Sequence, residues 1–247
     1  ARFTWGMVHR QHHGARLGQL MAEHRWREIE KSGEYSEVEI HTTPKVAPFF
    51  EKFGLIAFRN FLDRDLCDEL CNEITTAEKV GASVRLLQTS EKVTDGKYSK
   101  RKQTSELNTH SSTIVEEKLK GILSSLTEEK KLNLVDIQPP KYCLYETGDF
   151  FAHHVDTHDD KNANDISKFR KLSGIIFLNE VSQEPEEGKY CGGNLTFYGL
   201  NKNESFAKFG LPLVGEQGML ITFPPTLPHE VTPVTSGERF TIATWFI

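Results

Sequence analysis

The chain has 247 residues and a formal net charge of −5, and it contains no apolar run long enough to cross a bilayer. It also lacks a dense basic stripe, so neither a membrane nor a nucleic acid is expected as its main partner. Its four cysteines show no C-x-x-C spacing, and the sequence begins without the apolar region of a signal peptide. These features predict a reduced, cytoplasmic protein.

The N-terminal part, residues 1–45, is expected to be a largely helical extension, because apolar residues recur at helical spacing over 15–32. It could serve as an arm that binds a partner. The remainder, 46–247, is expected to form one domain, in which a helical support (46–133) precedes a β-rich core (134–247). The length is ordinary for a single domain of this kind.

The helical support also contains a polar stretch, 89–108, which has no apolar periodicity and is expected to be a long loop. The helix after it is expected to bury Ile114, Leu119, Ile122 and Leu126. The expected elements of the support are a helix from Val46, a strand at 55–58, a helix that starts after the N-cap residue Asp63, and a helix at 111–126.

From residue 134 onward, short β-rich segments alternate with turns that contain Gly, Pro and Asn. This density of strands predicts a sandwich or a barrel, so the fold class is mainly β with flanking helices (α+β). The expected strands are 141–145, 150–156, 172–178, 194–198, 218–223, 230–234 and 239–246.

Two histidines and one aspartate suggest a metal centre. Side chains two apart on a strand share a face, so His154 and Asp156 could bind one ion together, and His229 would supply a third ligand from a remote segment. Two imidazoles and a carboxylate occupy one face of an octahedral metal and leave the opposite face open, as in non-haem Fe(II) oxygenases. An isolated H-x-D is a weak signal, so the surrounding motifs matter.

Those motifs resemble the prolyl-4-hydroxylase-like 2-oxoglutarate/Fe(II) dioxygenases, from about residue 134 to the C-terminus. The resemblance implies a double-stranded β-helix (jelly-roll) core. It also implies Fe(II), 2-oxoglutarate and O2 as cofactors, with ascorbate as a reductant. The matching residues, in order, are Tyr145, Gly148, Phe150 and His154-Val155-Asp156, then Leu178-Asn179, Gly192-Gly193-Asn194-Leu195, Phe223-Pro224, Pro228-His229-Glu230-Val231 and Arg239 to Phe246.

By the same resemblance, Arg239 is the catalytic-site arginine that binds the distal carboxylate of 2-oxoglutarate. A guanidinium suits this role because it is a rigid fork that stays charged at any relevant pH. Thr241 lies two residues on, on the same strand face, and Tyr145 precedes the glycine turn, so both could donate to the cosubstrate. The chain departs from the family at Phe177, where some relatives carry a further tyrosine.

Three residues are candidates for substrate contact: Lys141, Arg101 and Trp245. Lys141 shares a strand face with Tyr145 and either projects into the barrel mouth or lies on a frayed strand end. Trp245 resembles a family tryptophan near the active site, although a core position is the alternative. Arg101 belongs to a basic run that also contains Lys100 and Lys102, which is either a solvated loop or a lid that orders when an acidic substrate binds.

The leading functional hypothesis is a hydroxylase of a prolyl or other residue in a peptide or protein, with release of succinate and CO2. The first alternative is a hydroxylase of a free amino acid or small metabolite. A non-enzymatic cupin-like binding module, or a zinc hydrolase with the same triad, is the third possibility. Arg239 argues against the third, because zinc hydrolysis needs no remote carboxylate clamp, and the Asp156 carboxylate favours hydroxylation over halogenation.

Overall fold

The computed structural model describes residues 54–81, 99–105, 107–157, 166–200 and 210–247, and the backbone of four further two-residue strands. The chain divides into two compact units, Ala1–Thr43 and Pro44–Ile247. In the first unit, β1 (Arg2–Phe3) and β2 (Glu39–Ile40) pair in parallel. The helices expected at 15–32 and from Val46 lie outside the described residues, and the division into an extension and one domain stays a prediction.

The larger sheet of the second unit has seven strands in the described part of the chain, and every neighbouring pair is antiparallel. β17 is the longest and lies at the centre between β10 and β8. In spatial order the strands are β3 (Ile56–Phe58), β14 (Leu220–Phe223), β10 (Leu172–Phe177), β17 (Arg239–Phe246), β8 (Lys141–Tyr145), β7 (Lys102–Thr104) and β4 (Val80–Gly81).

A second sheet faces the larger one, and its strands are also antiparallel. Its order is β13 (Leu211–Leu213), β12 (Leu195–Phe197), β15 (His229–Val231) and β9 (Phe151–His154). Two short pairs complete the described strands: β11 (Cys191–Gly192) with β16 (Val234–Ser236), and β5 (Val84–Arg85) with β6 (Lys92–Val93).

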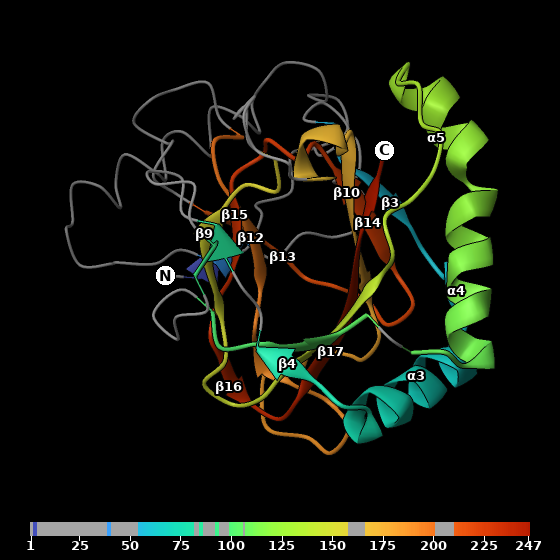
Figure 1. Cartoon of the computed structure of the whole chain (residues 1–247). Helices are drawn as coiled ribbons and strands as arrows, with labels where there is room; N and C mark the ends of the chain where they lie inside the picture. The colour runs from blue at the N-terminus through green and yellow to red at the C-terminus, as the bar shows by residue number, and fades with distance from the viewer. Residues whose placement is uncertain are drawn as a thin grey trace, which may run out of the picture. The chain divides into compact units, whose positions relative to one another are not determined.

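Helices lie on the side of the larger sheet that faces away from β9, β12 and β15 (Figure 1). Asp63 caps the first of them as predicted, because its carboxylate accepts the Leu66 N–H at 2.9 Å. Thr109 caps the next through a reciprocal pair of hydrogen bonds with Ser112. The helices are α3 (Arg64–Thr76), α4 (His110–Gly121) and α5 (Leu123–Lys130), and a 3₁₀ turn, η3 (Ile166–Phe169), precedes β10.

The alternation of side chains along the strands separates two hydrophobic clusters. On β17, Phe240, Ile242 and Phe246 pack toward the helices, whereas Ala243 and Trp245 pack between the sheets. Since Arg239 has the same parity as Ala243 and Trp245, its side chain also points between the sheets. The strand pattern therefore fixes which residues can reach an internal site.

Several predicted elements are corrected. The helix expected at 111–126 is broken at Ile122, after Gly121, a residue that weakens helices. Val115 is buried there, while Ile114 and Ile122 are half-buried. The loop expected at 89–108 contains β7, which pairs with β8. The strand expected at 230–234 splits into β15 and β16 around Pro233, which has no N–H to donate.

The fold class predicted from the sequence, mainly β with flanking helices, is confirmed. Within the described residues, no helix is both long and apolar enough to cross a membrane.

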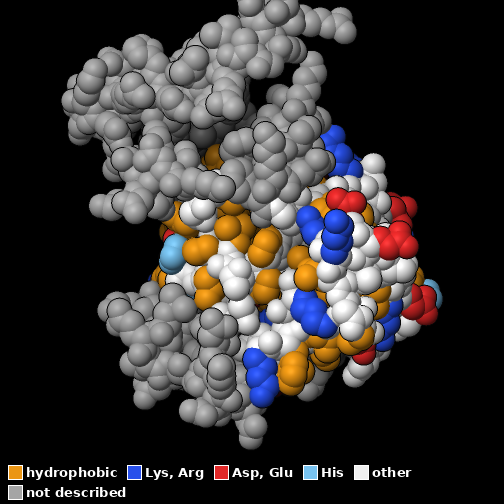
Figure 2. Space-filling view, turned by 90° about the horizontal axis from the view of Figure 1, so that it is seen from above, with side chains coloured by type: hydrophobic (Ala, Val, Ile, Leu, Met, Phe, Trp, Pro, Cys, Tyr) orange, Lys and Arg blue, Asp and Glu red, His pale blue; other side chains and the backbone are white. Residues whose placement is uncertain are grey.

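Figure 2 shows one face of the molecule. On this face hydrophobic side chains gather near the centre, Lys and Arg side chains lie beside them, and Asp and Glu side chains lie toward the right edge.

Candidate metal centre and cosubstrate pocket

The two histidines of the triad meet because β9 and β15 are paired with His154 directly opposite His229. The sequence predicted one strand through Asp156, but β9 ends at His154. Asp156 lies two residues beyond, where its backbone N–H donates to the Pro225 carbonyl at 2.8 Å. The carboxylate thus reaches the histidines from the turn after the strand, not from a shared strand face.

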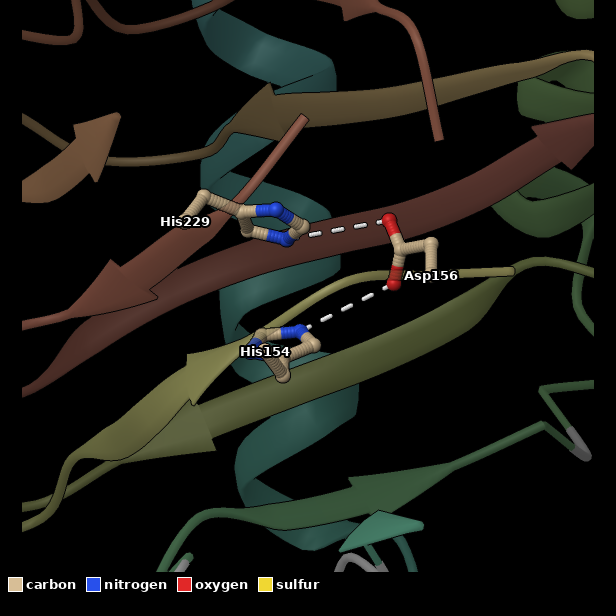
Figure 3. A group of neighbouring side chains, drawn as sticks. All are labelled: His154, Asp156 and His229. Atoms are coloured by element: carbon tan, nitrogen blue, oxygen red, sulfur yellow. Dashed lines mark ion pairs between the residues drawn. The ribbon is translucent and has the colours of Figure 1, made fainter. Parts of the chain in front are cut away.

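The three side chains converge on one point between the sheets (Figure 3). One ligand atom from each lies within 4.8 Å of the others. Asp156 lies between the imidazoles, with Oδ1 3.7 Å from His154 Nε2 and Oδ2 3.7 Å from His229 Nε2. This spacing leaves room for an ion that all three could bind.

Backbone carbonyls determine which nitrogen of each imidazole is available. His154 Nδ1 lies 2.8 Å from the Ala152 carbonyl, and His229 Nδ1 lies 2.9 Å from the Leu227 carbonyl. A carbonyl oxygen only accepts hydrogen bonds, so each Nδ1 carries the proton and donates it. In the neutral imidazole, Nε2 then carries the lone pair, as a ligating histidine requires.

Asp156 is held as a carboxylate. Burial by itself raises its pKa, but the two histidines, Arg170 and the Ser173 hydroxyl lower the pKa to about 2. Ser173 Oγ donates to Asp156 Oδ2 at 2.6 Å, which fixes the carboxylate plane. Burial, with His229 nearby, holds the pKa of His154 well below its usual value, so that imidazole is neutral. Two imidazoles and one carboxylate are the donor set that suits a non-haem Fe(II) centre, and the triad fits that metal.

Arg239 starts β17 next to Tyr145 of β8, and only 1% of its surface is exposed. Its Nη1 donates to Thr241 Oγ1 at 3.3 Å, while Nε and Nη2 are buried and have no hydrogen-bond partner among the described residues. The guanidinium carbon lies 4.9 Å from the Tyr145 ring centroid and 5.5 Å from that of Phe177. A buried guanidinium with unpaired donors is costly unless an anion completes it.

A glycine makes space for this arginine. Gly193 has φ +58°, and a Cβ placed on it would lie 2.8 Å from Arg239 Cδ. Any other residue would be strained at that φ and would push against the arginine stem. The Gly192-Gly193 pair of the sequence motif therefore has a steric role beside the clamp.

A cavity of about 360 Å³ contains the triad and the clamp, and the nine candidate site residues all line it. Lys141 and Trp245 are part of this wall, with Lys141 Nζ 5.2 Å from the Trp245 ring centroid. Trp245 is 5% exposed and its Nε1 has no hydrogen-bond partner within the described ranges. Besides the triad, the candidates that line the cavity are Tyr145, Arg239, Thr241, Lys141, Arg101 and Trp245.

Arg101 is not the solvated loop residue that one interpretation of the basic run predicted. It precedes β7 and its Nη1 donates to the Tyr145 hydroxyl at 3.1 Å, inside the cavity. Its neighbour Lys102 is the surface residue, because its Nζ pairs with Glu146 at 2.7 Å and remains partly exposed. The segment from residue 99 to 105 is therefore anchored to the sheet, while the lid expected over 92–105 lies partly outside the described residues and stays a prediction.

Arg170 was missed by the sequence analysis. Its guanidinium lies 3.7 Å from the Trp245 ring centroid, donates to the Asp156 carbonyl at 2.8 Å and donates to Gln138 Oε1 at 3.0 Å. No sequence motif marks this residue, which follows the polar segment after the H-x-D. Arg170 lies three residues before the inward-facing Ser173, so strand alternation would place it on the opposite face, but η3 and a turn precede β10 and alternation does not apply there.

The described core is a jelly-roll, and the triad inside it is a ligand set that suits Fe(II). Residues 140–247 match the sequence model of the 2OG-Fe(II) oxygenase superfamily. A PKHD-type hydroxylase from Shewanella oneidensis is 32% identical over 107 residues, which are 43% of this chain and 42% of that protein. The match thus spans about two fifths of that relative.

Two solved structures share the fold. A Pseudomonas putida prolyl-4-hydroxylase has a TM-score of 0.59 at 20% identity, over 82% of this chain and 96% of that one. A Trichoplax adhaerens prolyl hydroxylase, solved with a hypoxia inducible factor peptide fragment, has a TM-score of 0.57 at 16% identity, over 94% and 93%. The predicted jelly-roll and the predicted resemblance to the 2OG-Fe(II) oxygenases are confirmed. The family implies Fe(II) and 2-oxoglutarate.

Proposed function

We propose that this chain is a 2-oxoglutarate- and Fe(II)-dependent dioxygenase that hydroxylates an unactivated C–H bond and releases succinate and CO2. The observation that carries the proposal is the buried Arg239 guanidinium, whose Nε and Nη2 lack partners in the described part of the chain. It lines the same cavity as the triad. A metal hydrolase or a simple binding module has no need of such a clamp.

In this proposal His154, Asp156 and His229 hold Fe(II) through Nε2, a carboxylate oxygen and Nε2. When bound, iron with 2-oxoglutarate and O2 supplies the oxidising chemistry, and ascorbate serves as a reductant. Arg239 binds the distal carboxylate of 2-oxoglutarate, and Thr241 and Tyr145 donate hydroxyl hydrogen bonds to the cosubstrate. Ser173 holds Asp156 in position through its carboxylate, and Arg170 holds it through its backbone carbonyl.

The substrate that we favour is a prolyl or other residue in a peptide or protein. The support is the structural likeness to prolyl hydroxylases, one of which was solved with a peptide. Trp245 suits such a substrate, because it lines the cavity with the triad and its buried Nε1 has no hydrogen-bond partner among the described residues. A free amino acid or small metabolite remains the alternative, since a cavity of about 360 Å³ accommodates either.

The direct test is conversion of 2-oxoglutarate to succinate by the purified protein with Fe(II), ascorbate and O2. Many oxygenases of this kind consume cosubstrate slowly without substrate, so we expect iron-dependent succinate above a His154→Ala control. Binding of 2-oxoglutarate without oxygen should require metal. If the iron-loaded protein neither binds nor consumes 2-oxoglutarate, the proposed function is wrong.

A further inference from the structure

Arg101 is a cation in the cavity wall that neither the triad nor the Arg239 clamp employs. The backbone delivers it there: Ser99 forms a bridge with Phe151, and the Lys100 N–H donates to the Phe150 carbonyl at 3.2 Å. The next three residues form β7 against β8. Arg101 is thus fixed between the strand that carries Tyr145 and the strand that ends in His154.

Among the described residues, the Arg101 side chain forms its hydrogen bonds and its ring contact with uncharged groups. Nη1 donates to the Tyr145 hydroxyl at 3.1 Å, Nη2 donates to Gln103 Oε1 at 3.2 Å, and the guanidinium carbon lies 4.1 Å from the Phe151 ring centroid. Its Nε is buried without a hydrogen-bond partner, and it forms no ion pair with any described residue. Burial disfavours this cation and the Asp156 carboxylate favours it, but no described carboxylate pairs with it directly, which points to an anion that arrives with a ligand.

The charges of the loaded site indicate which ligand that is. Among the described residues that line the cavity, four are basic and Asp156 alone is acidic. Asp156 and the two carboxylates of 2-oxoglutarate would balance Fe(II) and Arg239. The Arg101 charge is left over, so the cosubstrate does not account for it. The remaining ligand of the site is the substrate.

We propose that the substrate carries a carboxylate and that Arg101 binds it beside the metal centre. This inference rests on the proposed function and narrows its substrate class. The carboxylate belongs to an acidic side chain of a peptide or to a small molecule such as an N-acylated amino acid, and both present the same planar anion to the guanidinium fork. Lys141 and Arg170, held near Trp245, would add long-range attraction.

The test compares probes that differ only in this charge. N-acetyl-proline is paired with N-acetyl-prolinamide, and an end-capped Ala-Pro-Glu-Ala peptide is paired with its Gln counterpart. Binding to protein loaded with Mn(II) and 2-oxoglutarate is measured by calorimetry, and succinate formation is measured with Fe(II). We expect at least one carboxylate probe to bind about 10- to 100-fold more tightly than its amide, the range for a hydrogen bond to a charged group. The pair that discriminates identifies the source of the carboxylate.

Arg101→Gln should abolish this discrimination, and Arg101→Lys should restore part of it. Lys102→Gln is the matched control, because it removes the adjacent, surface-exposed cation. Equal binding of both members of every pair by the wild type, including no binding of either, overturns the inference. So does an Arg101→Gln variant that loses 2-oxoglutarate affinity but keeps the discrimination, since Arg101 would then serve the cosubstrate. Substrate-free consumption of 2-oxoglutarate tests the proposed function separately.

Discussion

The metal triad and the Arg239 clamp lie in one cavity but are organised in opposite ways. In the triad, each side chain has a partner that orients it: backbone carbonyls for His154 and His229, and Ser173 for Asp156. At the clamp, Arg239 is fixed by packing, while two of its donor nitrogens lack partners within the described ranges. The side chains of the metal centre thus have their hydrogen-bond partners before a ligand arrives, whereas the donors of the clamp need an anion as their partner.

The largest expected effect follows from removal of a triad ligand. His154→Ala, Asp156→Ala and His229→Ala should each lose Fe(II) binding and all turnover, because these three residues supply the whole protein ligand set. Metal content after reconstitution and succinate formation are the measurements. A variant that keeps near-normal iron and activity would show that its residue is not a ligand. His153→Ala is the control, since that neighbour is exposed.

The clamp should respond differently. Arg239→Lys keeps the charge but loses the two-pronged geometry, so 2-oxoglutarate binding should weaken by about 1–3 kcal/mol, while metal affinity in its absence should be unchanged. Calorimetry with Mn(II)-loaded protein without oxygen measures both. Unchanged affinity for 2-oxoglutarate would place the clamp elsewhere.

A third prediction separates packing at the clamp from backbone strain. Gly193→Ala should destabilise the protein by about 1–2 kcal/mol through its positive φ, and should also weaken 2-oxoglutarate binding by displacing Arg239. Gly188→Ala is the matched control, because Gly188 has φ +75° and nothing lies within 4 Å of its added Cβ. It should lose stability but not cosubstrate affinity. If both variants bind 2-oxoglutarate equally well, Arg239 can be displaced without a loss of cosubstrate affinity.

The smallest effect is expected at the partner of Asp156. Ser173→Ala removes the hydroxyl that orients the carboxylate, so metal affinity should fall by about tenfold, the lower end for residues that orient a ligand. Competition with a metal-sensitive dye measures this loss. Affinity for 2-oxoglutarate in the metal-saturated variant should be near that of the wild type, and a larger change there would show that Ser173 also shapes the clamp.

Local patterns predicted much of the core. The strands at 141–145 and 239–246 occur with the predicted bounds, and the N-cap Asp63 was also predicted, because alternation and capping depend on neighbouring residues. The predictions that were wrong concern elements that depend on tertiary pairing. β7 is polar and became a strand only because β8 offers it an edge, and that pairing also brings Arg101 into the cavity.

The candidate site shows the same contrast between local patterns, which the sequence predicts, and tertiary contacts, which it does not. The H-x-D spacing predicted that His154 and Asp156 meet, and they do, although a turn and the Pro225 carbonyl bring Asp156 there and not strand geometry. The resemblance supplied Arg239, Thr241 and Tyr145, whose roles stay predictions. Arg170 could not be predicted, because its contacts with Trp245 and Asp156 join segments far apart in the chain.

The register of β8 and β17 limits how this site can change in evolution. These strands pair through five residues, and alternate positions face the helices and the cavity. Insertion or deletion of one residue in either strand would exchange the two faces, so that core residues such as Phe240 would enter the cavity and Arg239 would enter the core. New specificities should therefore arise by substitution at cavity positions such as Lys141, or by length changes in the connecting loops, and not by indels in these strands.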